Sequence, residues 1–156
     1  MKLFTLAAAS LAMAIAAPAF AQNVEKVGPA GGRILTAAKV QAGATTVYLS
    51  GNLASPATPG GSDYGDTKTQ TISTLKKIKE LLAAHGMTMK DIVRMDAYLV
   101  AAPGMDGKMD FAGFNAGFAE FFNNAENPTT TTRTTMQISA LAGPQFLVEL
   151  TVIAAK

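Results

Sequence analysis

Polar and apolar residues alternate in two segments near the end of the chain. Residues 135–140 alternate hydroxyl or amide side chains with apolar ones, and residues 146–154 do the same around Glu149. A two-residue period of this kind is typical of a strand with one buried face. Three earlier segments also have the β-branched, aromatic or alternating residues of strands: 33–40, 45–50 and 93–99.

Two other segments repeat their apolar residues at helical spacing. The first begins at Asp66 or Thr67 and ends at His85 and Gly86, where glycine can take the left-handed conformation common after a helix. The second, 109–122, carries a stripe of phenylalanines, which is far more typical of a core face than of a cofactor site. The order β, β, α, β, α, β, β predicts an α+β fold with two helices on one face of a sheet.

Glycine-containing turns suggest which strands are neighbours. Residues 41–44 are interpreted as a hairpin turn between the first two strands, and the polar, glycine-rich segment 22–32 as a mobile lead-in. Gly143 and Pro144 would form a second hairpin, between the last two strands.

The first twenty-one residues have the pattern of a cleavable secretory signal. A short basic start, an apolar run, a proline and the small residues before Gln22 follow one another, and the run is too short for a membrane-spanning helix. The alternative is an N-terminal anchor helix. We expect cleavage between Ala21 and Gln22, which leaves residues 22–156 as a single domain in the periplasm or secreted.

Charge and composition narrow the classes of partner. The chain has a formal net charge of +2, and loss of Lys2 with the signal lowers it to +1. The sequence has no basic stripe with interleaved aromatic residues, which argues against a nucleic-acid partner. It has no cysteine, and the single histidine, His85, has no neighbour with which to share a metal. No nucleotide-binding loop, HExxH motif or Ser-His-Asp grouping appears either.

Two charged residues in the last two predicted strands are candidates for chemistry. Arg133 stands at the start of its strand among hydroxyl residues, and its planar guanidinium suits a carboxylate. The alternative is a solvated surface arginine. Glu149 stands in the middle of an apolar strand, where it either faces solvent or is held by another group. If these two strands pair, both residues are offset in register and could border one cleft.

Five segments of the chain, taken in order, resemble the Rid family, the reactive intermediate deaminases also called the YjgF or RidA family. Together they run from about Ala44 to Ala154, and each is short, so the specificity of the resemblance comes from their order. The segments are TTVYLSGNL, DIVRMDAYL, DFAGFNAGFAEFF, RTTMQI and FLVELTVIA.

The resemblance implies a chorismate-mutase-like fold, assembled as a homotrimer with clefts between neighbouring subunits. It also implies a hydrolase that deaminates enamines and imines such as 2-aminoacrylate, 2-iminopropanoate and 2-iminobutanoate to 2-keto acids and ammonia. Such an enzyme uses no metal or organic cofactor. Within this resemblance, Arg133 matches the residue that grips the substrate carboxylate, and Glu149 matches the one that positions water. Four other positions match residues that line the family's cleft: Ser50, Gly51, Asn115 and Thr135.

The chain also departs from the family pattern. Asn52 replaces the usual glutamine, and Ala37 or its neighbours stand where many deaminases have a tyrosine. Three loops are longer than usual: those after Asn52, at 101–108 and at the threonine tract before Arg133. These departures, with the expected export, support an alternative in which the protein binds small carboxylates or a protein partner without turnover.

Overall fold

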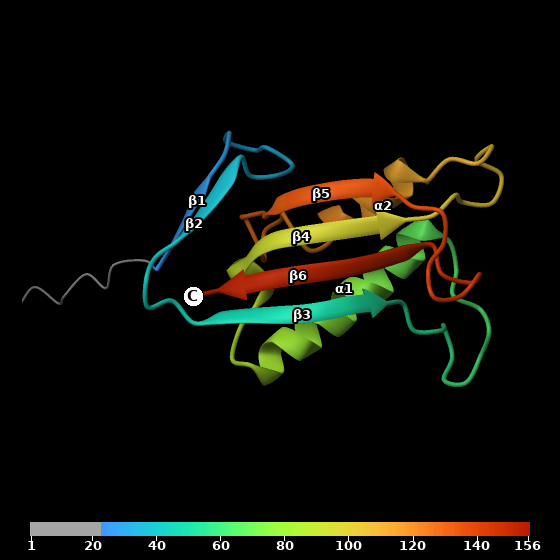
Figure 1. The fold of residues 1–156 in the computed structure, drawn as a ribbon, viewed down its shortest axis with the longest axis horizontal. Helices are drawn as coiled ribbons and strands as arrows, with labels where there is room; N and C mark the ends of the chain where they lie inside the picture. The colour runs from blue at the N-terminus through green and yellow to red at the C-terminus, as the bar shows by residue number, and fades with distance from the viewer. Residues whose placement is uncertain (1–22) are drawn as a thin grey trace, which may run out of the picture.

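The computed structural model describes residues 23–156, so the expected signal peptide, 1–21, and its cleavage site lie outside the described residues. A four-stranded sheet forms the centre of the fold, and both helices lie behind one of its faces (Figure 1). A two-stranded hairpin stands at one end of this sheet. The elements are β1 (Val24–Val27), β2 (Ala37–Val40), β3 (Thr46–Leu53), α1 (Thr67–Ala84), the 3-10 helix η1 (Met89–Asp91), β4 (Ile92–Leu99), α2 (Phe111–Ala119), β5 (Thr132–Gln137) and β6 (Val148–Ala155).

The strand order of the main sheet is β3-β6-β4-β5, and this corrects one expectation. The last two strands do not pair through Gly143 and Pro144, because β6 lies between β3 and β4 and is antiparallel to both. The crossover through α2 makes β5 parallel to β4, at the edge of the sheet. The central strand β6 buries Val148, Leu150, Val152 and Ala154 on the side that faces the helices.

The N-terminal hairpin corrects two further expectations. Segment 22–32 is not only a lead-in, since it contains β1, and β2 pairs with β1 instead of forming a hairpin with β3. Burial explains the arrangement, because Val24 packs with Val93 and Ala155 in a small cluster of its own. The Lys26 ammonium adds a polar anchor by donating to the carbonyl oxygens of Lys90 (2.7 Å), Ile92 (2.8 Å) and Thr130 (3.0 Å).

Both predicted helices are confirmed, with local signals at their ends. The Asp66 carboxylate caps α1 by accepting from the Thr69 backbone N–H at 2.8 Å, and the same bond lowers the pKa of Asp66. Gly86 has the expected left-handed conformation, with φ of 69°. The second helix is shorter than 109–122: it begins directly after its cap, Asp110, and ends at Ala119. No helix among residues 23–156 has the length and apolar character needed to cross a membrane.

The helices leave one face of the main sheet uncovered. The phenylalanine stripe of α2 is a core face as predicted, with Phe114, Phe118 and Phe122 buried beneath the sheet. The other face of the sheet points toward the viewer in Figure 1, and we call it the open face. In β3, Leu49 is buried toward the helices, whereas Tyr48 on the open face is 74% exposed. The fold is thus α+β with a mixed sheet and two helices on one face.

Candidate functional site

The strand register places Arg133 and Glu149 on opposite faces of the sheet. Arg133 is paired with Met95, which is buried in the core beneath the sheet. Glu149 is paired with Tyr98, three positions further along the same strand β4. Because successive side chains of a strand alternate between its faces, Arg133 points toward the helices and Glu149 toward the open face. The two residues therefore do not border one cleft within a single protomer.

Arg133 lies against α2, between aromatic rings. Its guanidinium carbon is 4.9 Å from the ring centre of Phe114 and 4.5 Å from that of Phe118. One guanidinium nitrogen, Nη2, donates to Asn115 Oδ1 at 2.9 Å. The helix thus supplies two flat apolar surfaces and one polar acceptor, which together fix the plane of the guanidinium.

The charge of Arg133 is not neutralised among the described residues. No carboxylate lies within ion-pair distance, since the ion pairs of residues 23–156 are Lys68–Glu120 and Arg94–Asp96. Burial, and secondarily the positive charge of Arg33, lower the pKa of Arg133 to about 10, so the group stays protonated at neutral pH. Arg133 Nη1 and the hydroxyl of Thr135 are buried without hydrogen-bond partners. A desolvated cation with an unused donor is poised to gain an anionic partner.

Glu149 lies at the other end of the sheet, beside the bulge in β3. The pairing of β3 with β6 shifts between Leu49 and Asn52, so Ser50 and Gly51 lie in the irregular part of the strand. The Glu149 carboxylate occupies the space that a side chain at position 51 would fill. A larger residue at position 51 would therefore displace this carboxylate, although the φ of Gly51 is not in the left-handed region. The Asn52 side chain closes the bulge by donating to the Ser50 carbonyl at 2.7 Å.

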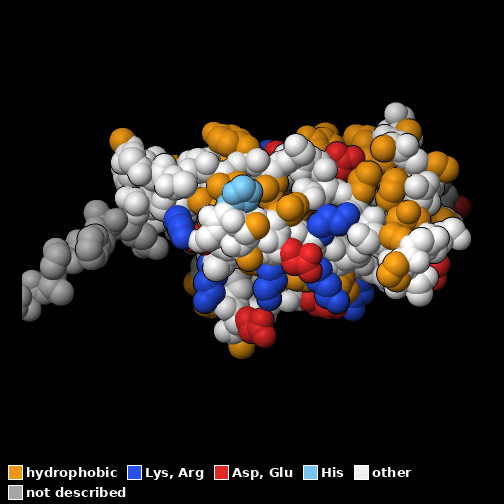
Figure 2. Space-filling view, turned by 90° about the horizontal axis from the view of Figure 1, so that it is seen from below, with side chains coloured by type: hydrophobic (Ala, Val, Ile, Leu, Met, Phe, Trp, Pro, Cys, Tyr) orange, Lys and Arg blue, Asp and Glu red, His pale blue; other side chains and the backbone are white. Residues whose placement is uncertain are grey.

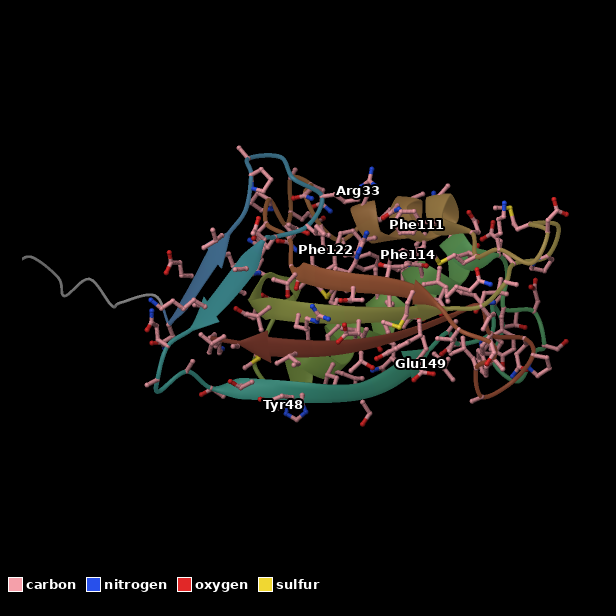
Figure 3. The ribbon with its side chains drawn as sticks, turned by 45° about the horizontal axis from the view of Figure 1, so that its top comes forward. Arg33, Tyr48, Phe111, Phe114, Phe122 and Glu149 are labelled. Atoms are coloured by element: carbon pink, nitrogen blue, oxygen red, sulfur yellow. The ribbon has the colours of Figure 1, made fainter. Side chains whose placement is uncertain are left out.

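The structure therefore divides the six expected site residues into two groups. Arg133, Asn115 and Thr135 lie on the helix side, near β5 and α2. Ser50, Gly51 and Glu149 lie at the junction of β3 and β6. Figure 3 shows Phe111, Phe114, Phe122 and Arg33 gathered near α2, and Glu149 apart from them.

Sequence reasoning did not assign Phe114, Phe118 and Arg33 to the site. The phenylalanine stripe was recognisable as a core face, but its stacking on Arg133 depends on a contact between α2 and a strand far along the chain. Nothing in the sequence around Arg33, apart from its charge, indicated that it lies near Arg133. Among residues 23–156, no group of three or more histidine, cysteine or carboxylate side chains is arranged to hold a metal ion.

Comparison with known proteins identifies the family. The family model described as Endoribonuclease L-PSP matches residues 36–156. The chain belongs to this family. A RutC family protein of Sulfurisphaera tokodaii is 33% identical over 113 residues, which cover 71% of this chain and 80% of that protein. A second RutC family protein, of Pyrococcus horikoshii, is 28% identical, and the match covers 70% of this chain and 79% of that protein.

Solved structures of the same family share the fold. A protein of unknown function of the conserved Rid family from Yersinia pestis superposes with a TM-score of 0.68 at 24% identity, covering 86% of this chain and 100% of that one. The YjgF gene product of E. coli gives 0.57 at 25% identity, covering 71% of this chain and 80% of that one. The resemblance to the Rid/YjgF family and the α+β fold are thereby confirmed.

Proposed function

We propose that the protein hydrolyses reactive imines and enamines, such as 2-iminopropanoate and 2-iminobutanoate, to 2-keto acids and ammonia. The observation that carries this proposal is the unneutralised, desolvated guanidinium of Arg133, held by Asn115 between two phenyl rings. A guanidinium in this state favours a planar carboxylate, which every 2-imino acid carries next to its reactive carbon. Family membership supports the same substrate class.

The chemistry requires little beyond positioning. Arg133 would bind the carboxylate, which places the adjacent imine carbon at a fixed distance from the guanidinium. A water oxygen attacks that carbon while Glu149 accepts one water proton and passes it to the imine nitrogen, which gives a carbinolamine. The same carboxylate then moves the proton of the new hydroxyl group to that nitrogen, so that the C=O bond forms as the amine leaves. The C–N bond breaks, and the products are a 2-keto acid and ammonia. Such imines also decay unaided in water, so modest acceleration is sufficient.

This mechanism requires a second copy of the chain, because one protomer separates the two charged groups. We propose a homotrimer in which Arg133 of one protomer and Glu149 of its neighbour border the same cleft. The uncovered face of the sheet supports this assembly, since Tyr48 is exposed there and Met136 is 41% exposed on the same face. Large apolar side chains on an uncovered sheet face are favoured where another subunit buries them.

The test of the proposed function generates 2-iminobutanoate with an amino-acid oxidase and follows its loss with and without the protein. Acceleration that disappears in Arg133→Ala and falls strongly in Glu149→Gln supports hydrolysis. The second candidate is a binder of small carboxylates without turnover, which the separation of Arg133 from Glu149 within a protomer favours. Saturable binding of 2-oxobutanoate that depends on Arg133, without acceleration for any of several imines, would establish the binder instead.

Surface charge gives little support to RNA cleavage, the activity in the description of the family model. On the side shown in Figure 2, lysines and arginines are interspersed with aspartates and glutamates and form no continuous basic stripe. His85, the single histidine, is exposed at the end of α1, where it caps the helix. Binding of RNA phosphates requires clustered positive charge, and cleavage requires side chains placed as general base and general acid. The interspersed charges on this side and the helix-capping His85 do not meet these requirements.

Replacing Tyr48 with aspartate is expected to convert the trimer into monomers. The added charge would be desolvated on the open face, whereas the isolated protomer leaves this side chain in solvent. Light scattering should give the protomer mass, and imine hydrolysis should be lost with it. Leu81→Asp is the matched control, because Leu81 is 38% exposed on α1, on the helix side of the sheet. A Tyr48→Asp protein with the mass and activity of the wild type would refute the proposed interface.

Replacing Gly51 with alanine is expected to lower the turnover rate by roughly tenfold or more, since displacement of a catalytic group by a fraction of an ångström is costly. The new Cβ would overlap the Glu149 carboxylate and lie 2.8 Å from its Cδ. The melting temperature should change little, because Gly51 is exposed. Adding Glu149→Asp, whose shorter side chain leaves room for the methyl group, should restore part of the rate. Unchanged kinetics in Gly51→Ala would show that the position of Glu149 is irrelevant to turnover.

A further inference from the structure

Arg33 lies in the connection between β1 and β2, and side chains from two distant segments hold its backbone in place. Thr130 Oγ1 donates to the Arg33 carbonyl oxygen at 2.8 Å, and Asn123 Nδ2 donates to the Gly32 carbonyl at 3.1 Å. The Leu35 backbone N–H donates to the Thr131 carbonyl at 3.0 Å. The lengthened threonine tract before Arg133 therefore has a structural role, because it holds the connection between β1 and β2 against the start of β5.

These anchors bring a second guanidinium to the Arg133 side of the sheet. In Figure 3, Arg33, Phe114 and Phe122 all lie in the region of α2. Thr130 and Thr131, which hold this connection, precede Arg133 by three and two positions, and the positive charge of Arg33 contributes, after burial, to the lowered pKa of Arg133. Neither guanidinium has a carboxylate within ion-pair distance among residues 23–156. Two like charges that share a region without an acid repel each other, and the repulsion is relieved by an anion that contacts both.

We propose that the second cation selects the substrate: the site prefers imines of dicarboxylic amino acids, with one carboxylate on Arg133 and the other on Arg33. This inference rests on the proposed function and narrows its substrate class. The buried guanidinium, fixed between the rings of Phe114 and Phe118, takes the carboxylate next to the reactive carbon. The exposed one, that of Arg33 in the hairpin connection, takes the distal carboxylate. The hairpin connection thus contributes to the specificity of a site whose other parts lie in β5 and α2.

Exposure of Arg33 limits the size of its effect. Solvent and salt screen an exposed charge, so its removal is expected to lower the preference for a dicarboxylate by about tenfold at low ionic strength and by less at physiological salt. Arg133 should act on monocarboxylates and dicarboxylates alike, whereas Arg33 should act on dicarboxylates alone. This difference separates a specificity residue from one that is needed for every substrate.

The experiment compares two imines generated by amino-acid oxidases, that of 2-oxoglutarate from glutamate and that of 2-oxobutanoate from 2-aminobutanoate. The wild type should have a higher kcat/KM for the dicarboxylic imine. Arg33→Gln should lower that value about tenfold and leave the monocarboxylic imine unchanged. Lys39→Gln is the matched control, because it removes an exposed positive charge from the same hairpin, in β2. Calorimetry with 2-oxoglutarate and 2-oxobutanoate provides a second readout that does not require turnover.

The outcomes distinguish this inference from the proposed function. Hydrolysis of both imines without a preference, unchanged in Arg33→Gln, would overturn the inference and leave the imine hydrolase intact. Absence of hydrolysis, together with 2-oxoglutarate binding that Arg33→Gln weakens selectively, would refute the hydrolase and support the dicarboxylate site. An equal loss for both imines with a smaller mass by light scattering would make Arg33 an interface residue and overturn the inference.

Discussion

Replacing Arg133 with alanine is expected to weaken binding of 2-oxobutanoate about a hundredfold, which corresponds to roughly 3 kcal/mol for a charge-assisted, bidentate contact in a desolvated setting. The guanidinium is already desolvated and oriented in the free protein, so little of the binding energy is spent on ordering it. Calorimetry on the wild type and the variant measures the effect directly. The imine assay should show a loss of kcat/KM of the same order.

Two further variants separate the charge of Arg133 from its packing. Arg133→Met keeps an apolar chain between Phe114 and Phe118, so it should lose the ligand and retain most of the melting temperature. Arg133→Lys should recover only part of the affinity, because an ammonium cannot bind a carboxylate in bidentate fashion. A large fall in melting temperature with unchanged affinity would show instead that Arg133 stabilises the fold and does not bind the ligand.

Mixing two inactive variants is expected to restore activity if the cleft is shared between protomers. Arg133→Ala trimers and Glu149→Gln trimers should each be close to inactive. Random trimers assembled from equal amounts of both should recover about a quarter of wild-type activity, because three-quarters of them are mixed and each mixed ring contains one intact cleft out of three. Co-expression with two different tags, followed by sequential affinity purification, isolates the mixed trimers, whose activity should be about a third of the wild-type value.

The matched control for this experiment combines Arg133→Ala with a protein that carries both substitutions. No intact cleft can form in that mixture, so its activity should stay at the background of the imine's own decay. If the Arg133→Ala and Glu149→Gln mixture also stayed at background, despite verified mixed trimers, the two residues would not act across one interface. Glu149 of the neighbouring protomer could then not be the proton acceptor of the proposed mechanism.

The sequence predicted the elements well, because their signals are local. The cap at Asp66, the left-handed Gly86 and the phenylalanine stripe each depend on residues within a few positions of one another. The strand containing Arg133 was also predicted, although its polar side faces the helices and its apolar Met136 faces outward. The polar side can face α2 because Phe114 and Phe118 stack on the Arg133 guanidinium.

The neighbours of the strands could not be predicted, because pairing depends on contacts between distant parts of the chain. Gly143 and Pro144 resemble a hairpin turn, yet burial of the apolar strand β6 in the centre of the sheet outweighs that local preference. The missed strand β1 has a similar cause, since a four-residue segment is stabilised by Val24 and Lys26 contacting β4 and its surroundings. The placement of Arg133 and Glu149 on opposite faces follows directly from this topology.

A catalytic arginine and a catalytic glutamate on opposite faces of one sheet would make the activity depend on protein concentration. A dilute chain would fold normally and still lack a complete cleft, so its specific activity would fall once the concentration dropped below the dissociation constant of the assembly. Folding and catalytic competence would then be separate events, and dilution of the trimer would abolish turnover without unfolding its protomers. A protein of this design would be active where it is concentrated and inactive where it disperses.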